Sequence, residues 1–335
     1  MKTKLWREGL IEKIKIVNPG TFEAVALEVF QYQAAHNPLY RRFVELLGIK
    51  PESVTTPAEV PFLPIRFFKT HDIQTGEWTA VHEFTSSGTT AATTSRHLLR
   101  DADWYRRVAR QGFEDRYGPL NRFAIFALLP AYLERAGSSL VFMADDFIRQ
   151  SAHPQSGFFL HNTAEMMERI QQCRQAQIPV LLLGVSFALW ELAENHPADL
   201  SGAIIMETGG MKGRRRELAR EELHQILMDA FQVDAIHAEY GMTELLSQAY
   251  SQGKGLFYPS SAMRVSTRDI TDPLSVLGWG KTGAINIIDL ANLDTISFIA
   301  TDDLGKAYPD GAFEILGRLD YSDLRGCNLL VEKNL

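Results

Sequence analysis

The spacing of hydrophobic positions changes along the chain. In the first 50 residues apolar side chains recur every three or four positions, as at Phe22, Val25 and Val29, which predicts a helical segment with a break at Pro38. The stretch 51–70 contains four prolines. Proline fixes φ and lacks an N–H group, so we expect extended connecting chain there rather than a central strand or helix.

Short apolar runs then alternate with helical patterns. The runs RFAIFALLP, IPVLLLG, GAIIMETGG and DAIHAEYG predict strands, whereas TAEMMERIQQCRQA, residues 186–195 and RRRELAREELHQILMDAF predict helices. This alternation predicts an α/β fold with substantial parallel sheet. After Gly278 the runs AINIIDL, TISFIATDD and AFEILGRLD lie close together and predict a β-rich lobe. We therefore divide the chain into 1–60 (helical), 61–275 (α/β core) and 276–335 (β-rich lobe), although one continuous domain also fits.

Composition and charge exclude several classes of protein. The chain has 335 residues with 34 Lys and Arg against 41 Asp and Glu, and a net charge of −7 disfavours a dedicated nucleic-acid binder. Two cysteines, Cys173 and Cys327, are too few for a disulfide framework, and the N-terminus has no apolar signal segment. We therefore expect a cytoplasmic protein. The longest apolar stretch, 178–190, is shorter than the roughly 20 residues of a spanning helix, so we expect no membrane span.

The most informative motif is EFTSSGTTAATTSRH at 83–97, in which eight hydroxyl side chains surround one glycine. Small hydroxylated residues around a glycine allow backbone N–H groups and hydroxyls to converge on an anion, as a phosphate site requires. The segment lacks the GK[ST] ending of a Walker loop. The same composition is also typical of a surface loop without a ligand.

Three further segments carry polar residues after apolar runs. HAEYGMTE (237–244) places two carboxylates beside a Tyr–Gly turn, and METGGMKGRRRE (206–217) places two glycines before a basic cluster. The strand ends of α/β sheets commonly present such groups to ligands. TDDLG (301–305) and GRLDYSDLRGCN (317–328) interleave acidic and basic residues. Taken singly, each segment also fits a structural role in a cap or turn.

Read together and in this order, the segments resemble the adenylate-forming superfamily of acyl-CoA synthetases, aryl ligases and luciferases. SSGTT resembles its phosphate loop, TGG its adenine-facing loop, YGMTE its nucleotide- and magnesium-binding segment, TDDLG its ribose-binding segment and GRLD its hinge. Within the superfamily the chain is most similar to the LuxE-type acyl-protein synthetases, through PFLPIRFFK, LLPAYLERAGSSLVFM, METGGMKGRRRE and SDLRGCNLLVE. The resemblance spans 61–331 and implies the N-terminal domain of an adenylate-forming enzyme, with mixed and parallel sheets flanked by helices.

The resemblance also implies the residues that hold ATP. The resemblance implies that five loop residues contact the β- and γ-phosphates: Ser86, Ser87, Gly88, Thr89 and Thr90. The resemblance implies adenine contacts for Gly209, Gly210 and Tyr240, and a nucleotide contact for Gly241.

The remaining implied roles concern the ribose and the chemistry. Asp303, with help from Arg318, would hold the ribose hydroxyls, and Thr243 would approach the α-phosphate. Glu244 would bind Mg²⁺, and Cys327 would accept the acyl group. A cysteine suits this role because its thiolate is strongly nucleophilic, and Cys327 also fits a packed strand position.

Two departures from the superfamily pattern stand out. Its phosphate loop usually continues with a glycine and a lysine, whereas here Ala91 and Ala92 follow and the nearest cation is Arg96. The chain ends just after the hinge, so we expect the small C-terminal domain, with the lysine that normally assists adenylation, to be absent. Acyl-protein synthetases share this second departure.

Three hypotheses about function follow. The first is an ATP- and Mg²⁺-dependent acyl-protein synthetase that activates a carboxylic acid, most simply a fatty acid, and forms an acyl thioester on Cys327 for an acyl reductase, acyl transferase or carrier protein. The second is an acyl- or aryl-CoA ligase. The third is a catalytically weak subunit that binds a nucleotide or an acyl group.

Overall fold

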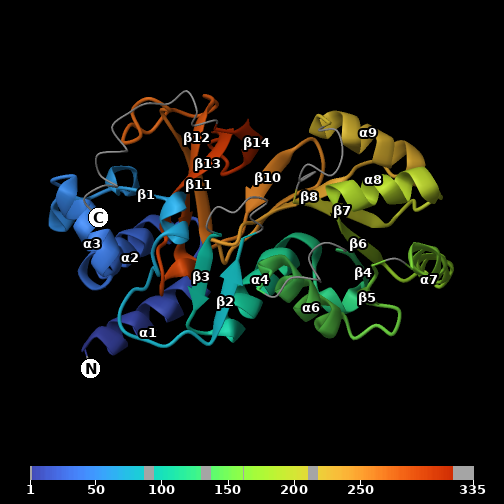
Figure 1. The fold of residues 1–335 in the computed structure, drawn as a ribbon, viewed down its shortest axis with the longest axis horizontal. Helices are drawn as coiled ribbons and strands as arrows, with labels where there is room; N and C mark the ends of the chain where they lie inside the picture. The colour runs from blue at the N-terminus through green and yellow to red at the C-terminus, as the bar shows by residue number, and fades with distance from the viewer. Residues whose placement is uncertain (1, 87–93, 130–136, 161, 210–217, 320–335) are drawn as a thin grey trace. The chain divides into compact units, whose positions relative to one another are not determined.

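The computed structural model describes residues 2–86, 94–129, 137–160, 162–209 and 218–319 (Figure 1). Its internal contacts divide the chain into two units: unit 1 comprises 1–108, 243–247 and 259–335, and unit 2 comprises 109–242 and 248–258. Each unit is therefore assembled from segments that are distant in the sequence. The division at 60/61 and 275/276 stays a prediction.

Helices form the N-terminal part of unit 1, as predicted. They are α1 (Lys2–Lys15), α2 (Phe22–His36) and α3 (Pro38–Leu46), and Asn37 caps α3 by accepting a hydrogen bond from the Tyr40 backbone N–H. The proline-rich stretch differs from the expectation: it contains the short 3-10 helices η1 (Pro51–Ser53), η2 (Pro57–Glu59) and η3 (Ile65–Lys69). Proline begins η1 and η2, where its missing N–H would have had no partner.

The sheet of unit 1 contains strands from the region predicted to be β-rich, together with β11 and β1 from outside it. Its order is β11 (Met263–Arg268), β12 (Gly283–Asp289), β13 (Phe298–Ala307) and β14 (Phe313–Arg318), all antiparallel, and β1 (Leu63–Pro64) pairs with β13 in parallel. The 3-10 helix η5 (Leu290–Asn292) follows β12. Two further strands, β2 (His82–Thr85) and β3 (Arg96–Leu99), form a separate antiparallel hairpin.

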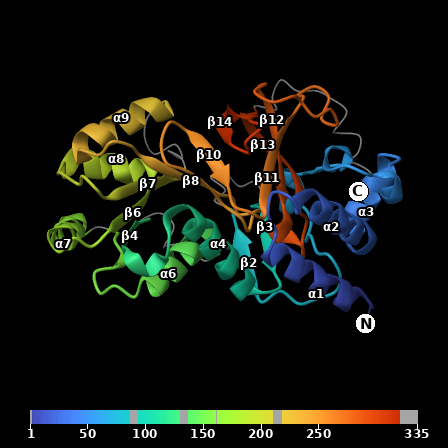
Figure 2. The ribbon, with the colours of Figure 1, turned by 180° about the vertical axis from the view of Figure 1, so that it is seen from behind.

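Aromatic rings fill the core between the helices and the sheet of unit 1. Phe298 of β13 packs edge-to-face on Phe30 of α2, with ring centroids 6.0 Å apart, and stacks on Tyr40 of α3 at 6.3 Å. The hydroxyl of buried Tyr40 donates a hydrogen bond to the Pro61 carbonyl at 2.6 Å. This packing fixes the helices against β13, the strand that carries TDDLG (Figure 2).

Unit 2 contains the predicted parallel sheet. Its order is β10 (Leu256–Pro259, with Pro259 assigned to unit 1), β9 (Ala249–Ser251), β8 (His237–Tyr240), β7 (Ile204–Thr208), β6 (Val180–Val185), β4 (Ala124–Leu128) and β5 (Gly157–Phe158). The strands from β8 to β5 are parallel, and β8 and β9 are antiparallel. All residues of β4 and β6 are buried, as expected for strands covered on both faces.

Helices connect these strands. They are α6 (Ser139–Ser151), α7 (Thr163–Gln175), α8 (Ser186–Asn195) and α9 (Arg220–Phe231), while α4 (Ala102–Tyr117) begins in unit 1 and continues in unit 2. The helices α8 and α9 pack together on one face of the sheet, and α6 lies on the other (Figure 1). The predicted α/β fold, with mixed and parallel sheets flanked by helices, is confirmed.

Candidate active site

The described ends of the hydroxyl-rich segment adjoin β2 and β3, which pair in antiparallel fashion. The backbone N–H of Ser86 donates to the Ser95 carbonyl at 3.0 Å, and the N–H of Ser95 donates to the Ser86 hydroxyl at 2.8 Å. These two bonds close the base of the loop. Ser87, Gly88, Thr89 and Thr90 lie outside the described residues.

Glu244 contacts the base of this loop. Its side chain is buried, and desolvation raises the pKa of its carboxyl group. The hydroxyl of Ser95 donates a hydrogen bond to this carboxyl group, and the positive charges of Arg318 and Lys69 also favour its ionised form. Residues from three distant parts of the sequence therefore act on one buried carboxylate.

His97 of β3 holds the residue before Glu244. Its Nδ1 lies 2.8 Å from the Thr243 carbonyl oxygen, and its Nε2 lies 3.1 Å from the Thr295 hydroxyl. Burial lowers the pKa of His97 to about 4, so the ring is neutral at physiological pH. Because a carbonyl only accepts, we place the ring proton on Nδ1, and Nε2 then accepts from Thr295.

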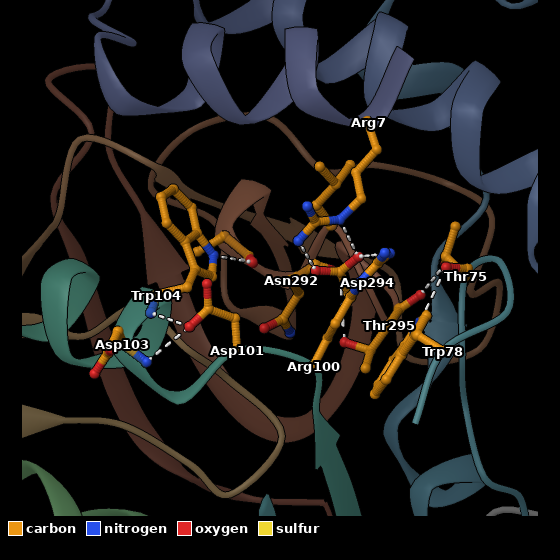
Figure 3. Close-up of polar contacts among 12 residues, drawn as sticks. Arg7, Thr75, Trp78, Arg100, Asp101, Asp103, Trp104, Asn292, Asp294 and Thr295 are labelled. Carbon is orange, nitrogen blue, oxygen red and sulfur yellow. Dashed lines mark hydrogen bonds and ion pairs between the residues drawn. The ribbon is translucent and has the colours of Figure 1, made fainter. Parts of the chain in front are cut away.

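The segment after β12 supports Glu244 from the other side. The side-chain amide of Asn292 donates to the Glu244 carbonyl at 2.8 Å. Nearby, Arg7 of α1 makes two hydrogen bonds to the Asp294 carboxylate at 2.6 and 2.5 Å, and Arg100 adds a third at 3.2 Å. Figure 3 shows both guanidinium groups directed at Asp294, beside Asn292 and Thr295. Paired arginine–carboxylate geometry of this kind fixes orientation as well as adding energy.

Asp289, at the end of β12, holds the residues after Glu244. Its Oδ2 accepts from the backbone N–H groups of Leu246 and Ser247, both at 2.9 Å. Its Oδ1 accepts from the Ser247 hydroxyl at 2.7 Å and from the Ala291 N–H at 3.1 Å. The segment that carries Thr243 and Glu244 is thus fixed at both ends.

Asp303 and Arg318 are direct neighbours across β13 and β14. They are register partners, and Arg318 Nε donates to Asp303 Oδ1 at 3.1 Å. Asp303 is buried, whereas the Arg318 side chain is 78% exposed. The pairing rests on Gly305, since a Cβ at that position would lie 2.0 Å from the Glu314 carbonyl oxygen.

Three more predicted residues lie in unit 2. Tyr240 ends β8, with its ring 5.9 Å from that of Phe257, and Gly241 follows it. Gly209 follows β7 with φ of 69°, a conformation that favours glycine, and its carbonyl accepts from the Ser186 hydroxyl at 3.3 Å. Gly210 and Cys327 lie outside the described residues, so the structure says nothing about their predicted roles.

Glu239 is a residue of this region that the sequence analysis did not single out. Its carboxyl group accepts a hydrogen bond from the Thr208 hydroxyl, and burial raises its pKa to about 7. A Cβ on Gly241 would lie 2.3 Å from Glu239 Oε1, so the glycine makes room for this side chain. Its strongly shifted pKa, at the carboxyl end of a parallel strand, is typical of functional sites.

A second unpredicted cluster surrounds buried Glu207 in β7. The Ser186 hydroxyl donates to its Oε2 at 3.1 Å, and His224 Nε2 lies 3.0 Å from its Oε1. Arg220 Nε lies 3.4 Å from the same Oε1. The carboxylate at the end of this strand is therefore compensated by three side chains from α8 and α9.

Unit 1 contains five of the predicted site residues: Ser86, Thr243, Glu244, Asp303 and Arg318. Gly209, Tyr240 and Gly241 belong to unit 2.

Glu244 suits Mg²⁺, because it is a buried carboxylate and this cation is usually bound through one or two carboxylates plus substrate phosphates. Among the described residues there is no group of three or more His, Cys, Asp or Glu side chains that could hold a metal ion. None of the helices in the described ranges is long and apolar enough to cross a membrane.

Comparisons with known proteins show the fold. No family model and no curated protein matches the sequence. Among solved structures, a 2-hydroxyisobutyryl-CoA ligase in the postadenylation state with R3-HIB-AMP matches 94% of this chain and 72% of its own, with a TM-score of 0.65 and 14% identity. ATP-bound MatB from Rhodopseudomonas palustris matches 71% of this chain with a TM-score of 0.52 and 15% identity.

A further structure of the 2-hydroxyisobutyryl-CoA ligase contains both 2-HIB-AMP and CoA, and it matches 89% of this chain with a TM-score of 0.64 and 14% identity. The chain spans about half the length of MatB, because the match covers 48% of that protein. Structural similarity at this level of identity establishes architecture. The chain therefore has the fold predicted for it, that of the N-terminal domain of adenylate-forming enzymes.

Proposed function

We propose that the protein uses ATP to convert a carboxylic acid to an acyl-adenylate and then passes the acyl group to a thiol. The observation that carries this proposal is the connected group in unit 1: the Ser86–Ser95 loop base, Glu244, and the Arg318–Asp303 pair. Sequence motifs that predict phosphate, magnesium and ribose contacts supply these residues. Their convergence on one buried carboxylate supports a nucleotide site.

In the proposed complex each part of ATP has its own contacts. The loop Ser86–Thr90 holds the β- and γ-phosphates with backbone N–H groups and hydroxyls. Asp303 accepts hydrogen bonds from the ribose hydroxyls, and Arg318 orients its carboxylate through the hydrogen bond between them. Thr243 contacts the α-phosphate. Tyr240, Gly209 and Gly210 contact the adenine, and Gly241 also contacts the nucleotide.

The first chemical step is attack of a carboxylate oxygen on the α-phosphorus. A new P–O bond forms, the bond to the β-phosphate oxygen breaks, and pyrophosphate leaves. The carboxylate thereby becomes a mixed anhydride with AMP as a good leaving group. The role of the protein is to position the groups and to stabilise the charge that develops on phosphate oxygens. Mg²⁺, held by Glu244 and the phosphates, would supply part of that charge stabilisation.

The second step transfers the acyl group to a thiol. A thiolate attacks the acyl carbonyl carbon, the C–O bond to AMP breaks, and a thioester forms. In the LuxE-type reaction this thiol is Cys327, with Arg325 two residues away to favour the thiolate. A fatty acid as substrate, and an acyl reductase, acyl transferase or carrier protein as final acceptor, belong to this proposal.

A second candidate is a ligase that releases acyl-CoA. It is favoured by the structure of the 2-hydroxyisobutyryl-CoA ligase, which contains both an acyl-AMP and CoA and matches 89% of this chain. The two candidates share the first step and differ only in the thiol. Cys327 is dispensable for the second.

Intact-mass spectrometry distinguishes the candidates. The protein is incubated with ATP, Mg²⁺ and a panel of short, long and aromatic acids, with and without CoA. A hydroxylamine-sensitive acyl adduct that requires ATP and disappears in Cys327→Ser supports acyl-protein transfer, and Cys173→Ser is the matched control. Acyl-CoA release that is unchanged in Cys327→Ser supports the CoA ligase. If none of the acids causes pyrophosphate release, both candidate functions are contradicted.

A further inference from the structure

The proposed phosphate loop contains no cation. Residues 86–95 read SSGTTAATTS, with no lysine or arginine. The triphosphate of ATP carries more negative charge than one Mg²⁺ neutralises, and positive side chains commonly complete this balance at phosphate-transfer sites. Another part of the chain is therefore expected to provide a cation.

Arg96, the cation nearest to the loop in sequence, is already engaged. Its Nε donates to Glu83 Oε1 at 3.1 Å, and its Nη2 lies 3.1 Å from Asp72 Oδ1. Binding a phosphate with Arg96 would mean giving up two carboxylates. Arg318 is likewise held by Asp303 at 3.1 Å, the residue proposed for the ribose. Neither arginine is a free source of charge for the phosphate chain.

Lys69, the last residue of η3, has a different environment. Its neighbours Phe67 and Phe68 are buried, and the Phe68 ring lies 5.3 Å from that of His97, the residue that holds the Thr243 carbonyl. The backbone that carries Lys69 is thus packed beside the segment of Thr243 and Glu244. The Lys69 side chain is exposed, its charge acts on Glu244, and within the described ranges it makes no ion pair.

We propose that Lys69 binds the phosphate chain of the nucleotide and supplies the positive charge that the hydroxyl-rich loop lacks. This inference rests on the proposed function and deepens it, because it assigns a binding residue to PFLPIRFFK, a motif that the sequence resemblance left without a role. A lysine suits the role, since its ammonium group is a compact point charge with three donors on a flexible stem. The Phe67–Phe68 anchor fixes its backbone while leaving that stem free to reach a ligand.

A purely structural role for Lys69 predicts a different outcome. If Lys69 only offset the charge of buried Glu244, its loss would destabilise the fold and weaken every nucleotide equally. The test is therefore calorimetric titration of the protein with MgATP, AMP and inorganic pyrophosphate, together with a melting curve for each variant. The variants are Lys69→Met, which keeps the stem without the charge, and Lys69→Arg, with Lys50→Met as a control at another exposed lysine of unit 1.

We expect Lys69→Met to weaken the binding of MgATP and of pyrophosphate by about tenfold to a hundredfold, the usual range for one charge-assisted contact. The affinity for AMP and the melting temperature stay unchanged. Lys69→Arg keeps most of the affinity, and Lys50→Met matches the wild type. Equal weakening of AMP and MgATP, or no weakening of either, overturns the inference.

The same titrations separate this inference from the proposed function. If the wild-type protein binds MgATP but none of the acids causes it to release pyrophosphate, the proposed function is contradicted. The comparison of Lys69→Met with the wild type still decides the inference in that case. Normal acid-dependent pyrophosphate release by Lys69→Met, with unchanged MgATP affinity, overturns the inference alone. Wild-type protein that binds neither MgATP nor pyrophosphate overturns both.

Discussion

Replacing Asp289 by asparagine tests the frame that carries Glu244. Asp289 is fully buried, and all of its recorded partners are donors: three backbone N–H groups and the Ser247 hydroxyl. A carboxylate accepts from all four, whereas an asparagine side chain has one accepting oxygen and one donating NH₂ group. The substitution keeps the shape of the side chain but replaces one accepting oxygen with a donating NH₂ group and removes the negative charge.

The expected loss in the free energy of unfolding depends on which hydrogen-bond donors lose their acceptor in Asp289→Asn. The asparagine oxygen replaces Oδ2 and still accepts from Leu246 and Ser247, and the Ser247 hydroxyl can turn to accept from the new NH₂ group. The Ala291 N–H, 3.1 Å from Oδ1, then faces a donor. One stranded buried N–H costs about 1–3 kcal/mol. We expect the free energy of unfolding to fall by that amount.

The assay is urea denaturation of Asp289→Asn beside Asp310→Asn. Asp310 is an exposed aspartate of unit 1 whose carboxylate accepts from the Ala312 N–H at 3.1 Å, so an asparagine there keeps the contact. Its variant stays within about 0.5 kcal/mol of wild type, as surface changes usually do. If Asp289→Asn were as stable as Asp310→Asn, the assignment of four donors to Asp289 would be wrong.

Three further predictions concern packing and pH. Gly305→Ala places a Cβ 2.0 Å from the Glu314 carbonyl oxygen, so we expect a loss of about 3 kcal/mol or more in thermal or urea unfolding, whereas Gly278→Ala, with no atom within 4 Å of its Cβ, is tolerated. Burial raises the pKa of Glu239 to about 7, so the native state keeps a proton that the unfolded chain releases near its ordinary value. The stability that this proton provides is full at low pH and is lost as pH rises to about 7. The free energy of unfolding then falls by up to about 3 kcal/mol. Glu239→Gln removes this dependence in unfolding curves measured from pH 5 to 8. His97 has the opposite sign: burial lowers its pKa to about 4, so stability is full above its ordinary value and falls as pH drops towards 4, and His97→Gln flattens that decline. A Glu239→Gln or His97→Gln protein whose pH profile matched the wild type would refute the corresponding assignment.

The elements of the fold follow from local spacing, which is why the sequence predicts them well. The helix over 186–195 and the buried strand β6 coincide with their predicted segments, because amphipathic spacing and an unbroken apolar run are local signals. The β2–β3 hairpin was missed, since its strands are short and flank a polar loop. The 3-10 helices of the proline-rich stretch were missed because proline both disfavours long helices and begins short ones.

The motif residues of the site can be predicted from the sequence, but the residues that hold them in place cannot. His97 and Thr243 are 146 positions apart, and Asp289 contacts residues more than 40 positions away, so only the folded chain joins them. Nothing in the sequence distinguishes Asp289 from the aspartates of surface turns. Likewise, the pKa of Glu239 is raised by burial in the folded chain, and the Thr208 hydroxyl, which is distant in sequence, opposes this shift through its hydrogen bond.

Formation of an acyl-adenylate from ATP is the step on which the proposed function depends. Acid-dependent exchange of labelled pyrophosphate into ATP measures this step alone, whichever thiol accepts the acyl group afterwards. We predict exchange with at least one class of carboxylic acid, and a loss of about a hundredfold or more in Glu244→Gln, the scale of removing one charge-stabilising group. Glu52→Gln, at an exposed glutamate of unit 1, serves as the control. No exchange with any acid, or equal exchange in Glu244→Gln and wild type, would contradict the account.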